Sequence, residues 1–360
     1  MINVTKTFLP QIDEYQQYIK GIFSRVWLTN NGPLLNELEL KLKDYLNVPH
    51  LLFLSNGTVA IQIAIKALEL KGEIITTPFS YVATTSSIVW EQCRPIFVDI
   101  DANTFNIDPG KIEAAITPAT SAILATHVFG NPCDIDAIQI IADKYNLKVI
   151  YDAAHCFGTT YKGKSVFQYG DISTTSFHAT KLFHTGEGGA VFTTQPELLK
   201  KMALLRNFGH TSPVTFDGVG INAKNSELHA AMGLCVLKYA DDIRAKRKQQ
   251  WNHYKTFLPG LQVKFITVTE GTDDYNASYF PIVFKTEEQL LKSVEALNLQ
   301  GIYPRRYFYP SLNTINYVDA CSCPNSEEIA QKVLCLPLYH DLSVEEQDMI
   351  GRILLRVQNN

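Results

Sequence analysis

Three polar clusters in the sequence follow apolar stretches and carry groups that could take part in catalysis. The first contains a lysine, Lys181, in the small-residue segment STTSFHATKLFHTGEGGAV, residues 173–191. Lysine is rarely buried without a partner or a task, because desolvation disfavours its charged form and lowers its pKa. An amine in such a place is a candidate for forming a Schiff base with a carbonyl compound. The alternative interpretation is an exposed loop lysine.

The other two clusters suit an anion and a protonated ring. Residues 55–58, Ser-Asn-Gly-Thr, stand directly before a predicted helix, where free N–H groups, a glycine and a hydroxyl suit a phosphate. A simple helix N-cap is the alternative there. Asp152 is followed by two alanines and His155. A carboxylate at this position could sit under a planar ligand and hold a proton on a ring nitrogen, or it could only cap the following turn.

Taken together, the three clusters match the needs of one cofactor. Pyridoxal phosphate requires an anchor for its phosphate, a counter-ion that keeps its pyridine nitrogen protonated, and an amine that holds its aldehyde. The set formed by residues 55–58, Asp152 and Lys181 supplies one of each. The sequence therefore predicts a pyridoxal-phosphate site.

The segments around these clusters alternate between strand and helix patterns. Helices are predicted at 12–23, 35–46, 60–68 and 135–145 from apolar residues three and four positions apart. Strands are predicted at 51–54, 73–76, 95–99, 122–127, 148–152, 172–177 and 189–193. Such alternation indicates a mainly parallel sheet with helices on both faces, in which ligands bind beyond the carboxyl ends of the strands. Each cluster follows a predicted strand, so we expect all three at this edge.

The pattern changes after about residue 245. A charged helix at 241–258 leads into the strand-like stretches VKFITV and SYFPIVF, and helices are predicted at 286–297 and 343–357. We therefore expect a large α/β domain over residues 1–245 and a smaller α+β domain over residues 246–360.

Composition excludes several classes of function. The formal net charge of −4 comes from 32 basic and 36 acidic residues that are mixed along the chain, which argues against a nucleic-acid or membrane-surface partner. No stretch approaches the roughly 18 apolar residues of a membrane span. The seven cysteines are scattered, and Cys321-Ser-Cys323 lacks the spacing and second ligand pair of a zinc site. We expect a cytoplasmic protein with reduced thiols and no metal.

The motifs place these residues in a known family. The sequence resembles the pyridoxal-phosphate-dependent nucleotide-sugar aminotransferases of the DegT type, which have fold type I. The likeness extends almost from end to end and rests on nine motifs in the family's order: NGP, LSNGTVAIQIAIKAL, TTPFSYVATTSSI, PIFVDID, HVFGNPCDIDAI, YDAAHCFGTTYKGK, SFHATKLFHTGEGG, LRNFGH and GINAKNSELHAAMGL.

The resemblance implies a role for each matching residue. Lys181 matches the lysine that carries the cofactor, and Asp152 matches the partner of the pyridine nitrogen. The remaining cofactor contacts it implies are Gly57, Thr58 and Ser176 at the phosphate, Tyr81 stacked on the ring, and His155 near the phenolic oxygen. Asn222 matches a residue that relatives donate to the phosphate of the neighbouring subunit, so the resemblance also implies a homodimer with shared active sites.

The same resemblance implies the reaction. An amino donor, usually glutamate, transfers its amino group to the cofactor, and the amine then passes to a keto group on a nucleotide-linked sugar. The run from His178 to Lys181, followed by Glu187-Gly188-Gly189, is typical of relatives that aminate C4 of a 4-keto-6-deoxy sugar. We expect dTDP-4-keto-6-deoxy-D-glucose as substrate and dTDP-4-amino-4,6-dideoxy-D-glucose as product. Amination at C3 of a dTDP-3-keto-6-deoxy sugar is the alternative.

Further substrate contacts are expected near the lysine and in the segment GIYPRRYFYPSLN, residues 301–313. They are His184, Glu187, Arg305 and Tyr309, because arginine suits a diphosphate and aromatic rings suit a base or sugar. Two other functions stay open at this point. A sugar dehydratase of the same fold would have histidine in place of Lys181, and a non-enzymatic protein of this fold would not need its site residues intact.

Overall fold

A computed structural model describes residues 1–258 and 260–359 of the chain, and its centre is a seven-stranded sheet. The strands are β2 (His50–Leu54), β3 (Glu73–Thr76), β4 (Arg94–Phe97), β5 (Thr120–Thr126), β6 (Lys148–Asp152), β9 (Ile172–Ser176) and β10 (Gly189–Thr193). Their order in the sheet is β2-β10-β9-β6-β5-β3-β4. Only β10 runs against the others. The prediction of a mainly parallel sheet is confirmed.

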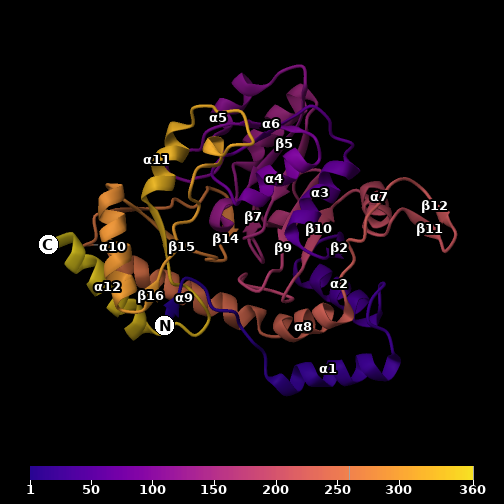
Figure 1. Cartoon of the computed structure of the whole chain (residues 1–360), viewed down its shortest axis with the longest axis horizontal. Helices are drawn as coiled ribbons and strands as arrows, with labels where there is room; N and C mark the ends of the chain where they lie inside the picture. The colour runs from indigo at the N-terminus through magenta and orange to yellow at the C-terminus, as the bar shows by residue number, and fades with distance from the viewer. Residues whose placement is uncertain (259, 360) are drawn as a thin grey trace.

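Helices cover both faces of this sheet (Figure 1). The helices of the described chain are α1 (Ile12–Arg25), α2 (Pro33–Tyr45), α3 (Gly57–Ala67), α4 (Val82–Trp90), α5 (Pro109–Ile112), α6 (Ile135–Tyr145), α7 (Pro196–Arg206), α8 (Glu227–Leu237), α9 (Ala240–Phe257), α10 (Glu287–Leu299), α11 (Pro324–Lys332) and α12 (Val344–Asn359). Strand β2 shows how the two faces are filled, since Leu51 and Phe53 join the core formed with α2 and α8, whereas Leu52 and Leu54 join the core formed with α3. Because both faces are buried, residues 51–54 of this strand are all apolar.

The C-terminal part has a sheet of its own, in which β15 (Phe280–Phe284) lies between β13 (Val263–Phe265) and β17 (Val333–Leu336) and runs antiparallel to both. Its core contains Tyr254 of α9, Leu290 of α10 and Ile350 of α12. Short pairings link it to the rest of the chain: β1 (Ile2–Asn3) pairs with β16 (Ile302–Tyr303), and β14 (Thr272–Asp274) extends the hairpin of β7 (Thr160–Tyr161) and β8 (Lys164–Ser165). The boundary at residue 245 stays a prediction.

One hairpin stands apart from these sheets. The hairpin of β11 (His210–Ser212) and β12 (Thr215–Phe216) projects from the body beside α7, at the right of Figure 1. None of the helices in the described part of the chain has the length and apolar character that crossing a bilayer requires.

A buried carboxylate joins two of the helices that cover the sheet. Glu227, at the start of α8, accepts hydrogen bonds from the backbone N–H groups of Leu34 and Leu35 at 3.0 and 2.9 Å, in the first turn of α2. Gly32 precedes that turn, and a Cβ there would lie 2.4 Å from Cδ of Glu227. The glycine of the NGP motif is therefore required by the close approach of the carboxylate.

We predict that Gly32→Ala lowers the free energy of unfolding by about 2 kcal/mol, because the added methyl group displaces a buried carboxylate from its two donors. Urea unfolding followed by circular dichroism measures the change. Gly21→Ala is the control, since the nearest atoms belong to the movable side chain of Arg25 and alanine inside α1 should keep or raise stability. Equal midpoints for the two variants would contradict the role given to Glu227.

Candidate active site

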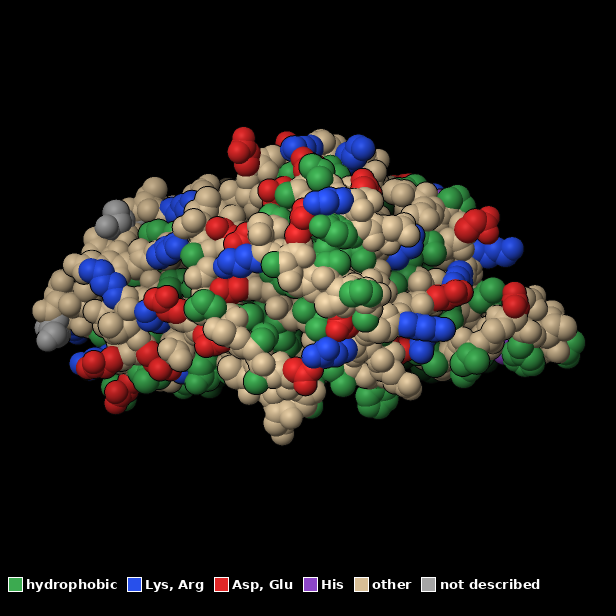
Figure 2. All heavy atoms as spheres, turned by 90° about the horizontal axis from the view of Figure 1, so that it is seen from above, with side chains coloured by type: hydrophobic (Ala, Val, Ile, Leu, Met, Phe, Trp, Pro, Cys, Tyr) green, Lys and Arg blue, Asp and Glu red, His purple; other side chains and the backbone are tan. Residues whose placement is uncertain are grey.

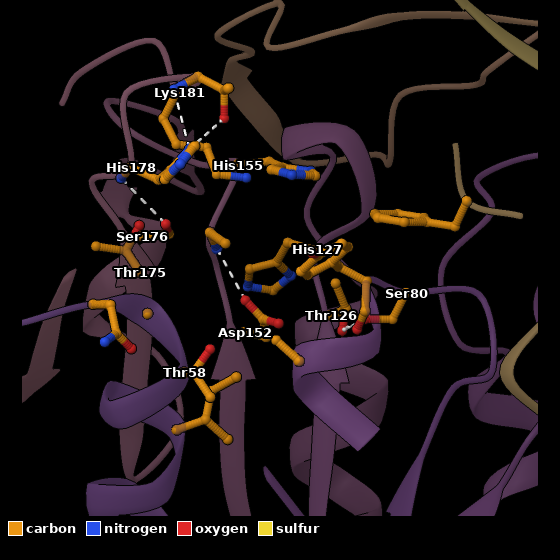
Figure 3. Close-up of a pocket in the computed structure, with 18 of the residues that line it drawn as sticks. Thr58, Ser80, Thr126, His127, Asp152, His155, Thr175, Ser176, His178 and Lys181 are labelled. Atoms are coloured by element: carbon orange, nitrogen blue, oxygen red, sulfur yellow. Dashed lines mark hydrogen bonds between the residues drawn. The ribbon is translucent and has the colours of Figure 1, made fainter. Parts of the chain in front are cut away.

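A cavity of about 260 Å³ opens at the carboxyl edge of the sheet (Figure 3). Nine of the residues selected from the sequence line it: Gly57, Thr58, Tyr81, Asp152, His155, Ser176, Lys181, Glu187 and Arg305. Asp152 and Ser176 end strands β6 and β9, and the start of α3 after β2 supplies two residues. The others come from the segments that follow β3, β6, β9 and β16. The sheet thus brings together three clusters that are spread over more than a hundred residues of the sequence.

The first turn of α3 forms the floor of an anion site. The side chain of Asn56 accepts a hydrogen bond from Val59 N–H at 2.9 Å and so begins the helix directly after β2. A Cβ at Gly57 would lie 2.9 Å from Cβ of Ser176, so the helix start can meet the end of β9 only through a glycine. The Ser176 hydroxyl accepts from His178 N–H at 3.3 Å, which leaves its own proton available to a ligand. Free N–H groups and hydroxyls of this kind suit a phosphate.

Asp152, the last residue of β6, points a buried carboxylate into the cavity. One oxygen accepts from the Thr84 hydroxyl at 2.7 Å and the other from Ala154 N–H at 3.1 Å. Burial raises the pKa of Asp152, while these two hydrogen bonds and the charge of Lys181 act in the opposite direction. The arrangement favours a ligand that brings a positive charge, such as a protonated ring nitrogen.

Lys181 lies in the loop between β9 and β10, and its backbone N–H donates to the carbonyl of His178 at 2.8 Å. Burial lowers the pKa of the Lys181 amine to about 8; Asp152 opposes this shift and Arg305 adds to it. A lysine with such a pKa is partly neutral near physiological pH, so it can act as a nucleophile and can both accept and release a proton. Lys181 is half-buried and lines the cavity, so it is not a fully exposed loop lysine.

His155 stands at the same cavity as a neutral ring. Burial keeps its pKa well below the usual value, and its ring lies 4.8 Å from Tyr279 and stacks at 5.9 Å on Phe308. Its Nδ1 is buried without a hydrogen-bond partner among the described residues. A buried polar atom without a partner in a ligand cavity is a position where a ligand group is expected to bind.

Tyr81, Arg305 and Glu187 line the outer part of the cavity. Tyr81 is 50% exposed and lines the cavity, so its ring is not packed in the core. The guanidinium of Arg305 lies 4.4 Å from the centre of the Tyr307 ring and makes no ion pair within the described residues. The Glu187 carboxylate lies 3.6 Å from Nε2 of His178.

Three selected residues do not line this cavity. His184 donates from Nε2 to the carbonyl of Phe8 at 2.6 Å and accepts at Nδ1 from Gly186 N–H at 3.2 Å, so both ring nitrogens hold the loop in place. The expectation that His184 contacts the substrate is therefore corrected, because neither ring nitrogen is left for a ligand. Tyr309 lies under the guanidinium of Arg306 at 3.7 Å, outside the cavity. Asn222 is exposed, bridged through its backbone to Asn207.

The cavity also contains polar residues to which the sequence analysis gave no individual role. They are Asn56, Ser80, Thr126, His127, Thr175, His178, Thr180, Tyr279 and Tyr307. His127 is fully buried and accepts at Nδ1 from Cys133 N–H at 2.9 Å, and burial lowers its pKa to about 3. Thr126 and His127 stand at the end of a predicted strand, so the rule that selected Asp152 could have found them.

The cavity therefore fits pyridoxal phosphate on four counts. It offers a helix start that only glycine permits, a buried carboxylate, an amine with a lowered pKa, and a buried imidazole nitrogen without a partner. Within the described residues, no three His, Cys, Asp or Glu side chains gather in a way that could hold a metal ion. With this sheet topology, the site defines a pyridoxal-phosphate enzyme of fold type I.

Comparison with known proteins gives the family. The model of the DegT/DnrJ/EryC1/StrS aminotransferase family matches residues 11–355. The dTDP-4-amino-4,6-dideoxy-D-glucose transaminase of Shigella dysenteriae is 44% identical over 348 residues, which cover 95% of each chain. The chain belongs to the DegT/DnrJ/EryC1/StrS family and is an aminotransferase that uses pyridoxal 5′-phosphate.

Solved structures agree with this assignment. DesI, analysed in the presence of its TDP-sugar product, superposes with a TM-score of 0.93 at 29% identity and covers 99% of this chain and 92% of its own. NtdA from Bacillus subtilis, with bound cofactor PMP, superposes with a TM-score of 0.89 at 30% identity and covers 97% of this chain and 82% of its own. The expected fold type is thereby confirmed.

We predict that the Lys181 amine reacts with a limiting acylating reagent with a midpoint near pH 8 in the cofactor-free protein. Only the neutral amine is nucleophilic, so reactivity rises with pH and levels off above the pKa. Exposed lysines should follow the ordinary value of about 10.4 in the same experiment. Competitive labelling at a series of pH values, read by peptide mass spectrometry, gives both profiles at once.

Arg305→Gln provides the control for the cause of this shift. Removing a nearby cation eliminates one of the two effects that lower the pKa of Lys181, so the midpoint should move upward. A Lys181 profile that coincides with those of the exposed lysines would show that the amine is not buried as described.

Proposed function

We propose that this protein transfers the amino group of glutamate to C4 of dTDP-4-keto-6-deoxy-D-glucose and so forms dTDP-4-amino-4,6-dideoxy-D-glucose. The observation that carries the proposal is the 44% identity, over 95% of both chains, to a transaminase named for that product. The cavity is consistent with it, since Lys181 and Asp152 provide the amine and carboxylate that transamination needs. Amination at C3 remains the alternative.

The cofactor contacts are part of the same proposal. Pyridoxal phosphate supplies an aldehyde and a ring that accepts electrons. Gly57, Thr58 and Ser176 bind its phosphate, Asp152 holds the proton on its ring nitrogen, and His155 faces its phenolic oxygen. Tyr81 lines the cavity with half of its surface uncovered, so its ring would be available to stack on the cofactor.

Lys181 performs the proton transfers in both halves of the reaction. Its neutral form would take the proton from the α-carbon of glutamate; water would then release 2-oxoglutarate, and the amino nitrogen would stay in the site for the second half. In the second half, the same side chain returns a proton to the carbon that receives the amine. One residue can serve as base and acid because its pKa, about 8, lies close to the working pH.

Arg305 is the proposed contact for the sugar-linked diphosphate. Its guanidinium reaches the cavity from the segment after β16 and has no carboxylate partner in the described chain, so it can pair with an anionic substrate. Glu187 stands at the same opening and is proposed to contact the sugar hydroxyls. Tyr309 stays a prediction for the nucleotide end, since it lies beside Arg306 and outside the cavity.

We further propose a homodimer in which Asn222 of each copy reaches the phosphate of the other. The hairpin and the loop that follows it expose three apolar side chains: Val214, Phe216 and Val219 are 82, 62 and 89% exposed. Hydrophobic side chains lie along the lower edge of the space-filling view, out to the projecting end at its right (Figure 2). Exposed apolar surface of this kind marks an interface.

The cellular setting is also a proposal. All seven cysteines are unpaired and six of them are buried, which suits a reducing compartment such as the cytoplasm. An activated amino sugar is a precursor for glycan assembly, so we propose that the product enters an O-antigen or related lipopolysaccharide.

We predict turnover of dTDP-4-keto-6-deoxy-D-glucose with glutamate, and a product that carries nitrogen on C4. A panel of dTDP-, UDP- and GDP-linked keto sugars, with NMR of each product, measures both nucleotide and position. Lys181→Ala should lose activity by about 10³-fold or more, because it lacks both nucleophile and proton carrier. The exposed Lys200→Ala should match the wild type. Nitrogen on C3 would overturn the proposed position.

We predict that protomers with Lys181→Ala and protomers with Asn222→Ala complement each other when they are produced together. Each variant alone should be impaired. A mixed dimer contains one site with both changes and one site with neither, so random pairing should restore about a quarter of the wild-type sites in a two-fold symmetric dimer. Activity of the mixture no higher than the mean of the two separate variants would contradict shared sites.

A further inference from the structure

The carboxylate of Asp152 is reached by a chain of three buried hydroxyl groups. The Thr84 hydroxyl donates to Oδ2 of Asp152 at 2.7 Å. Oγ of Ser80 lies 2.7 Å from Oγ1 of Thr84, and the Thr126 hydroxyl donates to Oγ of Ser80 at 3.2 Å. All three residues are at least 95% buried: Thr84 is 0%, Ser80 2% and Thr126 5% exposed.

The carboxylate fixes the direction of every hydrogen bond in this chain. An ionised carboxylate only accepts hydrogen bonds, so the Thr84 hydroxyl must donate its single hydrogen atom to Asp152. Thr84 is then the acceptor of the short contact with Ser80, and Ser80 the acceptor of the contact with Thr126. The other acceptor within reach of Ser80 is the Tyr81 carbonyl, at a longer 3.2 Å. Three hydroxyl dipoles are thus aligned with their positive ends toward Asp152.

The chain follows the carboxyl edge of the sheet. Asp152 ends β6, Thr126 ends the adjacent strand β5, and Ser80 lies in the loop after β3, the next strand along. Thr84 stands in the first turn of α4, four residues beyond Ser80, so the two hydroxyls face the same side of the chain. Figure 3 shows Ser80 and Thr126 in contact on the side of the cavity where Asp152 lies.

We propose that Thr84, supported by Ser80 and Thr126, is a positioning residue that aims the Asp152 carboxylate at the ring nitrogen of the cofactor and stabilises it as an anion. This inference rests on the proposed cofactor contact of Asp152. Aligned hydroxyl dipoles reinforce one another, so the support that Thr84 gives is greater when Ser80 and Thr126 are intact. None of the three hydroxyls is assigned a role by the family motifs described above.

The need for such support follows from burial. Burial alone raises the pKa of Asp152, and the Thr84 hydroxyl is the strongest of the groups that oppose the rise. A neutral carboxylic acid would no longer compensate a protonated ring nitrogen. The hydroxyl chain supplies the compensation without a second cation, which would compete with the ring for the carboxylate.

The direct experiment measures the affinity of the cofactor-free protein for pyridoxal phosphate in three variants. Thr84→Val keeps the shape but removes the donor, and it should weaken binding by about tenfold or more, as expected when a buried charge loses a hydrogen bond. Thr84→Ser retains a hydroxyl and should recover most of the affinity. Ser80→Ala should also weaken binding, but by a smaller factor, because the Ser80 hydroxyl supports Asp152 only through Thr84.

Thr85→Val is the matched control. Thr85 is the next residue of α4, equally buried, and its hydroxyl has no hydrogen-bond partner among the described residues. Its replacement should leave cofactor affinity unchanged, and thermal unfolding of each cofactor-free variant reports any loss of fold. Wild-type affinity in Thr84→Val, or equal losses in Thr84→Val and Thr85→Val, would overturn the proposal.

A pH series gives a second readout that a purely structural role would not move. Without the Thr84 donor, Asp152 takes up a proton at higher pH, so the fall of cofactor affinity on acidification should begin at higher pH in Thr84→Val than in Thr85→Val. The other titratable groups facing Asp152 are Lys181, His127, His155 and Cys156. Burial keeps both imidazoles neutral and the thiol protonated, and Lys181 titrates near 8. If cofactor affinity falls at the same acidic pH in both variants, Thr84 does not stabilise the Asp152 anion.

These measurements separate the inference from the proposed function. They follow the binding of pyridoxal phosphate and use no sugar, so a wrong assignment of nucleotide or carbon position leaves them unaffected. Failure of the wild-type protein to bind pyridoxal phosphate would instead remove the proposed site itself.

Discussion

The active site depends on keeping an amine, Lys181, and a carboxylate, Asp152, together in one desolvated cavity. Burial lowers the pKa of Lys181 and raises that of Asp152, so it pushes both groups toward their neutral forms. Their mutual attraction opposes both shifts, and each group also has local support: the hydroxyl of Thr84 for the carboxylate, and for the lysine a loop held by His184. The result is an amine ready to act as a nucleophile beside a carboxylate ready to hold a cation.

The sheet topology makes this juxtaposition possible. Parallel strands end at the same edge, so β2, β6 and β9 deliver an anion site, a carboxylate and a hydroxyl to one place. The reversal of β10 is equally important, because a short loop can then join the end of β9 to the start of its neighbour at that edge, and Lys181 lies in this loop. The C-terminal part contributes Arg305 from beyond β16 and closes the cavity on its outer side.

Much of this arrangement follows from local sequence, and the rest does not for identifiable reasons. Strong apolar periodicity predicted helices such as α2 and α6. Helix α4 was not predicted, because its VATTSSIVW is rich in threonine, serine and β-branched residues, and α8 was not, because it is apolar almost all round. Among site residues, His184 was selected by its closeness to Lys181, whereas its ring turns to the carbonyl of Phe8. Thr84 was not selected, since its partner Asp152 is 68 residues away.

The central claim is that Lys181 is the amine that binds the cofactor's aldehyde. Loading the protein with pyridoxal phosphate, reducing it with borohydride and mapping the labelled peptides tests this claim directly. The account predicts that the pyridoxyl label is found on the peptide containing Lys181 and is lost in Lys181→Ala. Label on another lysine, or no label on a protein that has bound the cofactor, would contradict it.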